Sequence, residues 1–146
     1  MTAITGEAVS AMHAALVNAT GNRSFPVRTL GKWQVAALQK LTRFSLLKPN
    51  WDSYGSPPIA DSVIDAAAEL LSGLPLEQRS AFSMTPVSGG GVHLEWEKGE
   101  RKLILEVRPD ATFDILIVDG DEITEFFAPS LTSAAIEGPL VWLDAR

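Results

Sequence analysis

The sequence contains no cysteine, one tyrosine and two histidines, His13 and His93. Without cysteine the chain cannot form a disulfide bond, a thiolate nucleophile or a cysteine-ligated zinc site. It also lacks the G-x-S-x-G, H-E-x-x-H and P-loop motifs of common enzyme families. Any catalysis would have to rest on carboxylates or hydroxyls. The sequence therefore favours a protein that is not an enzyme over a hydrolase that uses Glu95 or Asp52.

Long apolar runs are missing as well. No stretch reaches the roughly 18 uncharged apolar residues of a membrane helix, and the first residues lack the basic and apolar regions of a signal peptide. We therefore expect a soluble, cytoplasmic protein that has no membrane partner and uses no cofactor. Hydrophobic residues make up 46% of the 146 residues, which is enough for one domain with its own core.

Negative charge is concentrated in the second part of the chain. Residues 1–50 carry six lysines and arginines against the single acid Glu7, whereas residues 51–146 carry six basic and 17 acidic residues. This asymmetry fits a basic arm for nucleic acid, an acidic surface for a basic partner, or two halves that neutralise each other within one fold. Six dispersed cations are few for the phosphate contacts of a nucleic-acid binder, so nucleic acid is disfavoured as a partner.

Apolar residues at helical spacing precede the predicted strands. Residues 33–47 carry such a stripe that ends before Pro49, and residues 59–70 carry a second one that ends at Gly73. Residues 1–29 are expected to form an N-terminal helix and linker that acts as a capping or interaction arm, and residues 30–146 a single α+β domain. The stripe of the N-terminal helix is short and alanine-rich, formed by Val9, Met12 and Leu16.

Residues 92–127 alternate between apolar and polar side chains with the period of a strand. A turn at Lys98-Gly99, a loop at 109–111 and a turn at Gly120-Asp121 would fold them into a four-stranded antiparallel meander. The predicted cross-strand partners are Leu94 with Leu103, Glu95 with Lys102, Leu105 with Ile115, and Ile115 with Phe126.

Both faces of this meander are apolar. The inner face should pack on the helices, with a core formed by Trp33, Leu41, Phe44, Val63, Leu70, Leu94, Trp96, Leu105, Ile115 and Phe126. Five apolar side chains left in water on the outer face would forfeit roughly 1.5 to 3 kcal/mol each, so we expect a second copy of the protein or residues 1–29 to cover them, with a homodimer favoured. These outer-face residues are Ile104, Leu116, Val118, Ile123 and Phe127.

The end of the chain predicts one more helix. Ser130 to Glu137 has helical character, and Gly138-Pro139 should end it, with Trp142 as an anchor beyond. The order of helices, four strands and a short helix predicts a two-layer α+β fold, in which N-terminal helices and the C-terminal helix accompany an antiparallel four-stranded meander.

The loop at residues 50–59 is the most unusual segment. Trp51, Asp52 and Tyr54 lie in it among glycine and prolines. They could form a recognition surface, because aromatic side chains bury a large area at low entropic cost. The sequence favours a structural role instead, with the rings closing the end of the helical layer while Asn50 and Asp52 bind backbone groups of the turn.

This loop carries a resemblance to a known group of proteins. The motif N-W-D-x-Y-G at residues 50–55, together with G-G-x-x-L-E-W at residues 90–96, resembles small bacterial proteins of unassigned function. The resemblance spans residues 47–107 and implies a bacterial, cytoplasmic source but no activity and no catalytic residues. Those proteins usually have glycine in the second turn of the sheet, where this chain has Ala111.

The pattern of polar residues on the first predicted strand leaves a metal site disfavoured. His93, Glu95 and Glu97 project from one face at steps of two residues, a spacing at which neighbours could share a metal. Glu95 already has Lys102 as its expected partner, so we predict no metal site.

Taken together, these features favour a non-catalytic protein-interaction or regulatory accessory module of bacterial or phage origin. It would act through the apolar outer face and the acidic surface. The alternative is a small-ligand-binding domain with an aromatic pocket between sheet and helices, lined by Trp51, Tyr54, His93 and Trp96.

Overall fold

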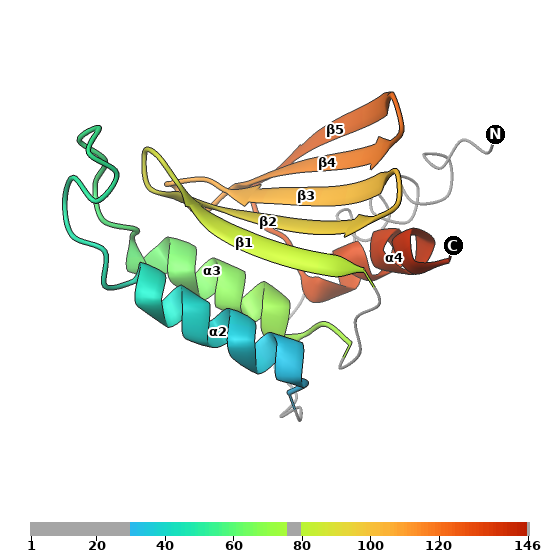
Figure 1. The fold of residues 1–146 in the computed structure, drawn as a ribbon, viewed down its shortest axis with the longest axis horizontal. Coiled ribbons are helices and arrows are strands. Elements are labelled where there is room, and N and C mark those ends of the chain that lie inside the picture. Colours follow the sequence, from blue (N-terminus) through green and yellow to red (C-terminus); the bar gives the residue numbers. More distant parts are fainter. Residues whose placement is uncertain (1–29, 76–79, 146) are drawn as a thin grey trace.

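Within residues 30–75 and 80–145, which the computed structural model describes, the chain forms three helices and five strands. The strands make one open antiparallel sheet in the order β1-β2-β3-β4-β5, and the helices lie together on one side of it (Figure 1). The fold is α+β, as the sequence predicts, but the sheet has five strands instead of four. In chain order the elements are α2 (Lys32–Phe44), α3 (Asp61–Ser72), β1 (Ala81–Val87), β2 (Gly91–Lys98), β3 (Arg101–Val107), β4 (Phe113–Asp119), β5 (Glu122–Ala128) and α4 (Ser133–Asp144).

The additional strand, β1, forms one edge of the sheet and pairs with β2. In β1, Phe82, Met84 and Pro86 alternate with polar or small residues, which is the pattern of a strand with one buried face. Proline lacks a backbone N–H and is therefore excluded from central strands, but an edge strand tolerates it. The prediction of four strands is wrong because Pro86 is a local signal against a strand, and the sequence does not show that β1 lies at the edge, where proline is tolerated.

The second and third hairpins have the predicted registers. Leu105 pairs with Ile115, and Ile115 pairs with Phe126. At the end of the second hairpin the N–H of Arg108 donates to the carbonyl of Thr112 at 2.8 Å, which confirms the predicted loop between them.

The first hairpin differs from the prediction by two residues. Its turn begins at Gly99, so Leu94 pairs with Leu105 and not with Leu103. Gly99 has a φ of 61° and occupies the first central position of a two-residue turn, where a positive φ favours glycine. A shift of two residues leaves every side chain on its predicted face. The predicted faces are therefore correct although the predicted partner is wrong.

Ala111 occupies the last position of the second hairpin loop with a φ of 65°. Its N–H donates to the carbonyl of Arg108 at 2.8 Å, which holds the loop in this conformation. A left-handed backbone places the Cβ atom close to a carbonyl oxygen and costs a residue other than glycine roughly 1 to 2 kcal/mol.

Replacing Ala111 with glycine is therefore expected to raise the free energy of unfolding by about 0.5 to 1 kcal/mol, because the relief of strain exceeds the added entropy of the unfolded chain. Urea denaturation measures the change. Ala81→Gly, at an exposed position of β1, is the matched control and should destabilise. An Ala111→Gly variant that is less stable than the native protein would show that the backbone of Ala111 is not strained.

The core lies between the inner face of the sheet and the helices. Eight of the predicted core residues are buried, whereas Trp33 and Phe126 are half-buried and pack against its margin. Trp33 contacts Phe82 edge-on, with 5.4 Å between ring centroids, which extends the core to the edge strand. The buried members of the predicted set are Leu41, Phe44, Val63, Leu70, Leu94, Trp96, Leu105 and Ile115.

A buried polar residue, Gln34, joins α2 to α3. Its side-chain amide donates hydrogen bonds to the carbonyls of Leu71 and Leu74 at 2.9 and 2.8 Å. Its Oε1 accepts a hydrogen bond from the N–H of Gly31 at 2.7 Å. Backbone groups at helix ends have no partner within their own helix. Gln34 therefore provides hydrogen bonds both to carbonyls at the end of α3 and to an N–H at the start of α2. The sequence did not indicate this role.

Helix α4 continues through Pro139, whereas the sequence predicts a helix over residues 130–137 only. A proline inside a helix costs about 3 kcal/mol because it removes a hydrogen bond and crowds the preceding turn. Ile136, Leu140 and Leu143 are buried on one face of α4. Burial of each contributes roughly 1.5 to 3 kcal/mol, so the packing outweighs the proline.

Basic side chains tie the end of α4 to the sheet. Arg101 donates from Nη1 to the carbonyl of Trp142 at 2.9 Å, and its guanidinium lies 4.5 Å from the centroid of that ring. Lys98 donates to the carbonyl of Asp144 at 2.9 Å. Cations at a helix C-terminus satisfy open carbonyls and interact favourably with the helix dipole. Trp142 thus acts as the anchor that its position predicts.

The N-terminal arm predicted in residues 1–29, with its helix at 6–19, lies outside the described residues. In the part of the chain that the structure describes, no helix combines the length and the apolar character needed to cross a membrane.

Candidate functional site

The outer face of the sheet, opposite the helices, has a polar half and an apolar half. Its polar half lies over β1 and β2 and includes Ser83, Thr85, His93, Glu95 and Glu97. Its apolar half lies over β3 to β5, where Leu116 pairs directly with Ile104, and Val118 with Ile123. We call the five apolar residues that the sequence placed here the outer patch: Ile104, Leu116, Val118, Ile123 and Phe127.

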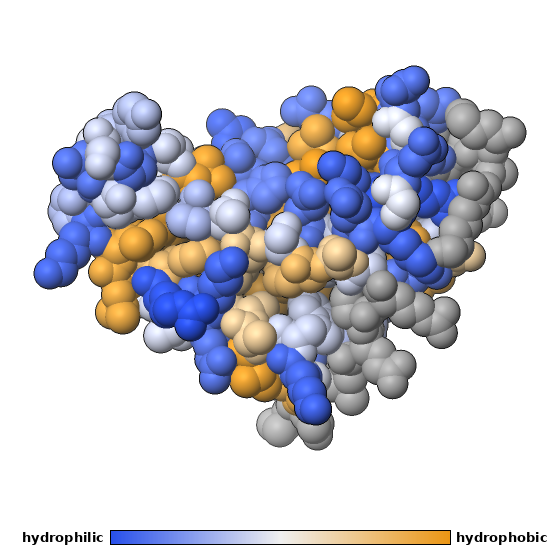
Figure 2. Space-filling view, viewed as in Figure 1, coloured by the Kyte–Doolittle hydropathy of each residue, from blue (hydrophilic) through white to orange (hydrophobic). Residues whose placement is uncertain are grey.

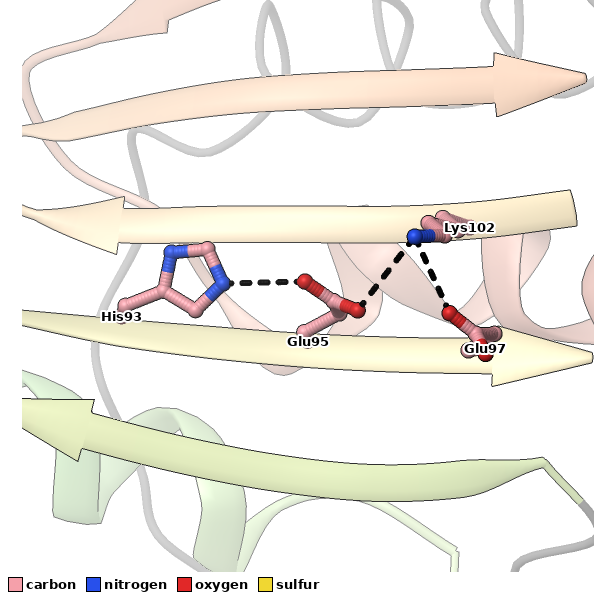
Figure 3. Close-up of polar contacts among 4 residues, drawn as sticks. All are labelled: His93, Glu95, Glu97 and Lys102. Carbon is pink, nitrogen blue, oxygen red and sulfur yellow. Dashed lines mark hydrogen bonds and ion pairs between the residues drawn. The ribbon is translucent and has the colours of Figure 1, made fainter.

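A row of polar contacts joins the polar half to Lys102 on β3 (Figure 3). Nε2 of His93 lies 3.1 Å from Oε1 of Glu95, and Nζ of Lys102 lies 3.8 Å from Oε2 of Glu95 and 3.0 Å from Oε2 of Glu97. The hydrogen bond with Glu97 and the charges of both carboxylates raise the pKa of Lys102. Lys102 pairs with Glu97 across the ladder, and Glu95 with Ile104, so the predicted pairing of Glu95 with Lys102 is wrong although their side chains are still close.

The outer patch is only partly covered. Ile123 and Phe127 are 63% and 57% exposed, whereas Ile104, Leu116 and Val118 are half-buried. Figure 2 shows apolar atoms over β5 beside hydrophilic ones. The described residues of the single chain therefore leave the two residues on β5 uncovered. The cover predicted from the sequence, by a second copy or by residues 1–29, lies outside these residues.

Carboxylates border the outer patch. Glu125 pairs with Leu116 across β4 and β5, and Asp114 lies between Glu106 and Phe127 in the row of outer-facing side chains. Arg108 approaches from the neighbouring loop, with Nη1 3.6 Å from Oδ1 of Asp114 and Cζ 5.8 Å from the ring centroid of Phe127. Acidic groups thus border the outer patch at Leu116 and Phe127, and Lys102 lies beside Val118.

The Asp52 loop, residues 50–58, is organised around one carboxylate. Oδ1 of Asp52 accepts hydrogen bonds from the N–H groups of Tyr54 and Ser56 at 2.9 and 3.2 Å. Oδ2 accepts hydrogen bonds from the hydroxyls of Ser56 and Ser88, the latter at 2.6 Å. Ser88 belongs to the turn between β1 and β2, so Asp52 attaches the loop to the sheet.

The rest of the loop supports this arrangement. Asn50, Ser53 and Gly55 have positive φ angles of 64°, 65° and 81°, and Oδ1 of Asn50 accepts a hydrogen bond from the N–H of Gly55 at 2.7 Å. The indole N–H of Trp51 donates to the carbonyl of Pro57 at 2.8 Å. Asn50 and Asp52 thus bind backbone groups of the turn, as the structural interpretation predicts.

The hydrogen bonds of Asp52 predict a pH effect. The hydroxyls of Ser56 and Ser88, followed by the N–H groups of Tyr54 and Ser56, hold the pKa of Asp52 far below its usual range. A carboxyl whose pKa falls on folding stabilises the protein above its unfolded pKa, near 4, and this contribution is lost as the pH falls further. Asp52→Asn should therefore flatten the loss of thermal stability below about pH 4. Melting curves across this range test it, with Asp61→Asn, exposed on α3, as the control.

The structure does not assemble the predicted aromatic pocket. Trp96 points into the core and is fully buried, whereas His93, three residues earlier on β2, lies on the outer face. Tyr54 is 89% exposed at the tip of the Asp52 loop, and Trp51 packs against the core. The four residues therefore lie in different environments, and Tyr54 does not close the helical layer.

A different concave surface lies between α2 and the edge strand β1. This groove has a volume of about 330 Å³ and is mostly apolar. Among the described residues that line it, Lys40 is charged, and Ser80 and Ser83 carry hydroxyls. These residues offer few polar groups to orient a small ligand. Its lining consists of Trp33, Ala36, Ala37, Lys40, Ser80, Phe82, Ser83 and Met84.

The two carboxylates considered for hydrolysis are both engaged in structural contacts. Asp52 accepts hydrogen bonds within its loop, and Glu95 contacts His93 and Lys102. A general base needs access to a bound water or substrate.

Among the described residues, no three histidine or acidic side chains form a group that could hold a metal ion.

Comparisons of the chain with protein-family models, with curated proteins and with solved structures found no match. The geometry of the outer face therefore carries the functional argument.

Proposed function

We propose that the protein is a non-catalytic interaction module, a small regulatory or accessory protein whose outer patch docks on a partner protein. The observation that carries this proposal is the exposure of Ile123 and Phe127, 63% and 57%, on an ordered strand next to other apolar residues. Burying each against a partner would contribute roughly 1.5 to 3 kcal/mol. Clustered apolar side chains at the surface are typical of interaction sites.

The acidic border indicates the charge of the partner. Glu106, Asp114 and Glu125 border the outer patch. Its two neighbouring cations are already paired: Arg108 with Asp114, and Lys102, which lies opposite Val118, with Glu97. Opposite charge across an interface speeds association and excludes wrong partners. Two copies of this face would bring like charges together, so the partner in this proposal is a different, basic protein and not the homodimer expected from the sequence.

Capture from a lysate of the native host tests the proposal. Immobilised native protein should retain a partner in a defined stoichiometry, and Ile123→Glu should reduce the retained amount at least about tenfold, because the substitution removes apolar contact and places a charge in the interface. Leu46→Glu and Val141→Glu are matched controls, since Leu46 and Val141 are 72% and 71% exposed away from the sheet.

Circular dichroism should show that all three variants remain folded. Equal retention by Ile123→Glu and by the controls would contradict docking through the outer patch. A concentration-dependent dimer in sedimentation experiments, lost in Ile123→Glu but not in the controls, would identify a second copy as the partner instead.

A further inference from the structure

Strand β5 is an open edge of the sheet. Among the described residues its one neighbouring strand is β4. Ile123, Glu125 and Phe127 are all exposed, and their side chains lie on the outer face. An edge strand that has exposed apolar side chains and unpaired backbone groups is a template for pairing with another chain.

The hydrogen-bond pattern shows which backbone groups of β5 do not bond to β4. The pair Arg108 and Thr112 is hydrogen-bonded between β3 and β4. Because residues of an antiparallel strand bond alternately to either side, even-numbered residues of β4 bond to β3 and odd-numbered ones to β5. Even-numbered residues of β5 therefore bond to β4. The N–H and C=O groups of Ile123, Glu125 and Phe127 point to the free edge.

Glu125 determines what can pair with this edge. It lies midway between Ile123 and Phe127 on the outer face. In a symmetric pairing of two copies that sets Ile123 beside Phe127, Glu125 would face its own counterpart. Like charges directly opposite each other destabilise a strand pair, whereas opposite charges stabilise it. The edge therefore disfavours a second copy and favours a strand with a cation at its centre.

We propose that β5 binds an extended segment of a basic partner protein by strand addition. The segment carries lysine or arginine opposite Glu125 and apolar side chains two residues to either side, which continue the rows of Ile123 and Phe127. Main-chain hydrogen bonds to the free edge supply affinity, and the alternate side chains supply specificity. This inference rests on the proposed function and names the mode and chemistry of its partner.

A capped synthetic peptide, Thr-Val-Thr-Lys-Thr-Val-Thr, tests the proposal on the full chain. In the proposed pairing the N–H groups of its lysine and two valines face β5, and those of its central threonines face solvent. One control peptide is N-methylated at lysine and valine, and a second at the threonines between them. A third has glutamate in place of lysine. Amide hydrogen exchange and chemical shifts, followed by NMR, report binding.

The unmodified peptide and the threonine-methylated peptide should bind and slow exchange at Ile123, Glu125 and Phe127. The peptide methylated at lysine and valine should not bind. Replacing lysine with glutamate should weaken binding at least about fivefold, and Glu125→Lys should reverse this preference.

Equal binding of all methylated forms would overturn strand addition while leaving the outer patch as a docking surface. Absence of binding at about 1 mM peptide would also overturn it, and the lysate capture would then decide the proposed function independently. Protection of the same three amides in a dimer of the protein alone would make a second copy the occupant and overturn the basic partner.

Discussion

Replacing Gln34 with glutamate is expected to lower the free energy of unfolding by about 4 kcal/mol. The carboxylate cannot donate the two hydrogen bonds that Gln34 gives to the carbonyls of Leu71 and Leu74. Loss of each hydrogen bond costs roughly 0.5 to 1.5 kcal/mol, since the carbonyl of Leu71 keeps the N–H of Leu74 as a donor at 3.3 Å. Because Gln34 is fully buried, the new charge would also lie out of water. Urea denaturation followed by tryptophan fluorescence measures the loss.

Gln39→Glu is the matched control, because Gln39 lies on the exposed face of the same helix. Its effect should stay within about 0.5 kcal/mol, as for most surface substitutions. A Gln34→Glu protein as stable as the control would contradict the role of Gln34 in joining α2 and α3.

Truncation of Trp96 to alanine should cost about 3 to 5 kcal/mol. Trp96 is fully buried on the inner face, with its ring centroid 4.9 Å from that of Phe82. Its removal leaves a large cavity that the sheet cannot close. Thermal and urea unfolding measure the loss.

Two further variants sharpen this test. The buried indole N–H of Trp96 has no hydrogen-bond partner among the described residues. Trp96→Phe removes this donor and retains an aromatic ring, so it should cost less than the alanine variant. Tyr54→Ala, at an exposed ring, should change stability by less than about 0.5 kcal/mol. Equal losses for Trp96→Ala and Tyr54→Ala would contradict the burial of Trp96.

The faces of the sheet could be predicted because strand alternation has a period of two, and a register error of two residues preserves it. This is why Leu94 and Trp96 were correctly placed in the core although the partner of Leu94 was wrong. The extent of α4 could not be predicted in this way. Pro139 is a strong local signal against a helix, and only the packing of Ile136 and Leu140 on the sheet overrides it.

Gln34 had no recognisable signature. Its partner Leu71 lies 37 residues away along the chain, and a polar residue within an apolar stripe reveals its role only when the two helices are in contact. The exposure of Tyr54 could not be predicted either, because the burial of an aromatic side chain in a loop depends on where the loop packs on the rest of the fold. The residues of the outer patch could be predicted from the sequence. That β5 lies at the edge of the sheet could be seen only from the order of the strands in the structure.

A photo-crosslinking residue at Ile123, compared with one at Leu46, tests the central claim most directly. Both positions are exposed, 63% and 72%, but only Ile123 lies in the outer patch. After irradiation in the native host, position 123 should give a discrete adduct, and mass spectrometry should map it to a partner segment with a lysine or arginine between apolar residues. Position 46 should not give this adduct. The same adducts from both positions, or no adduct at 123 other than the protein itself, would contradict a docking site for a basic partner on β5.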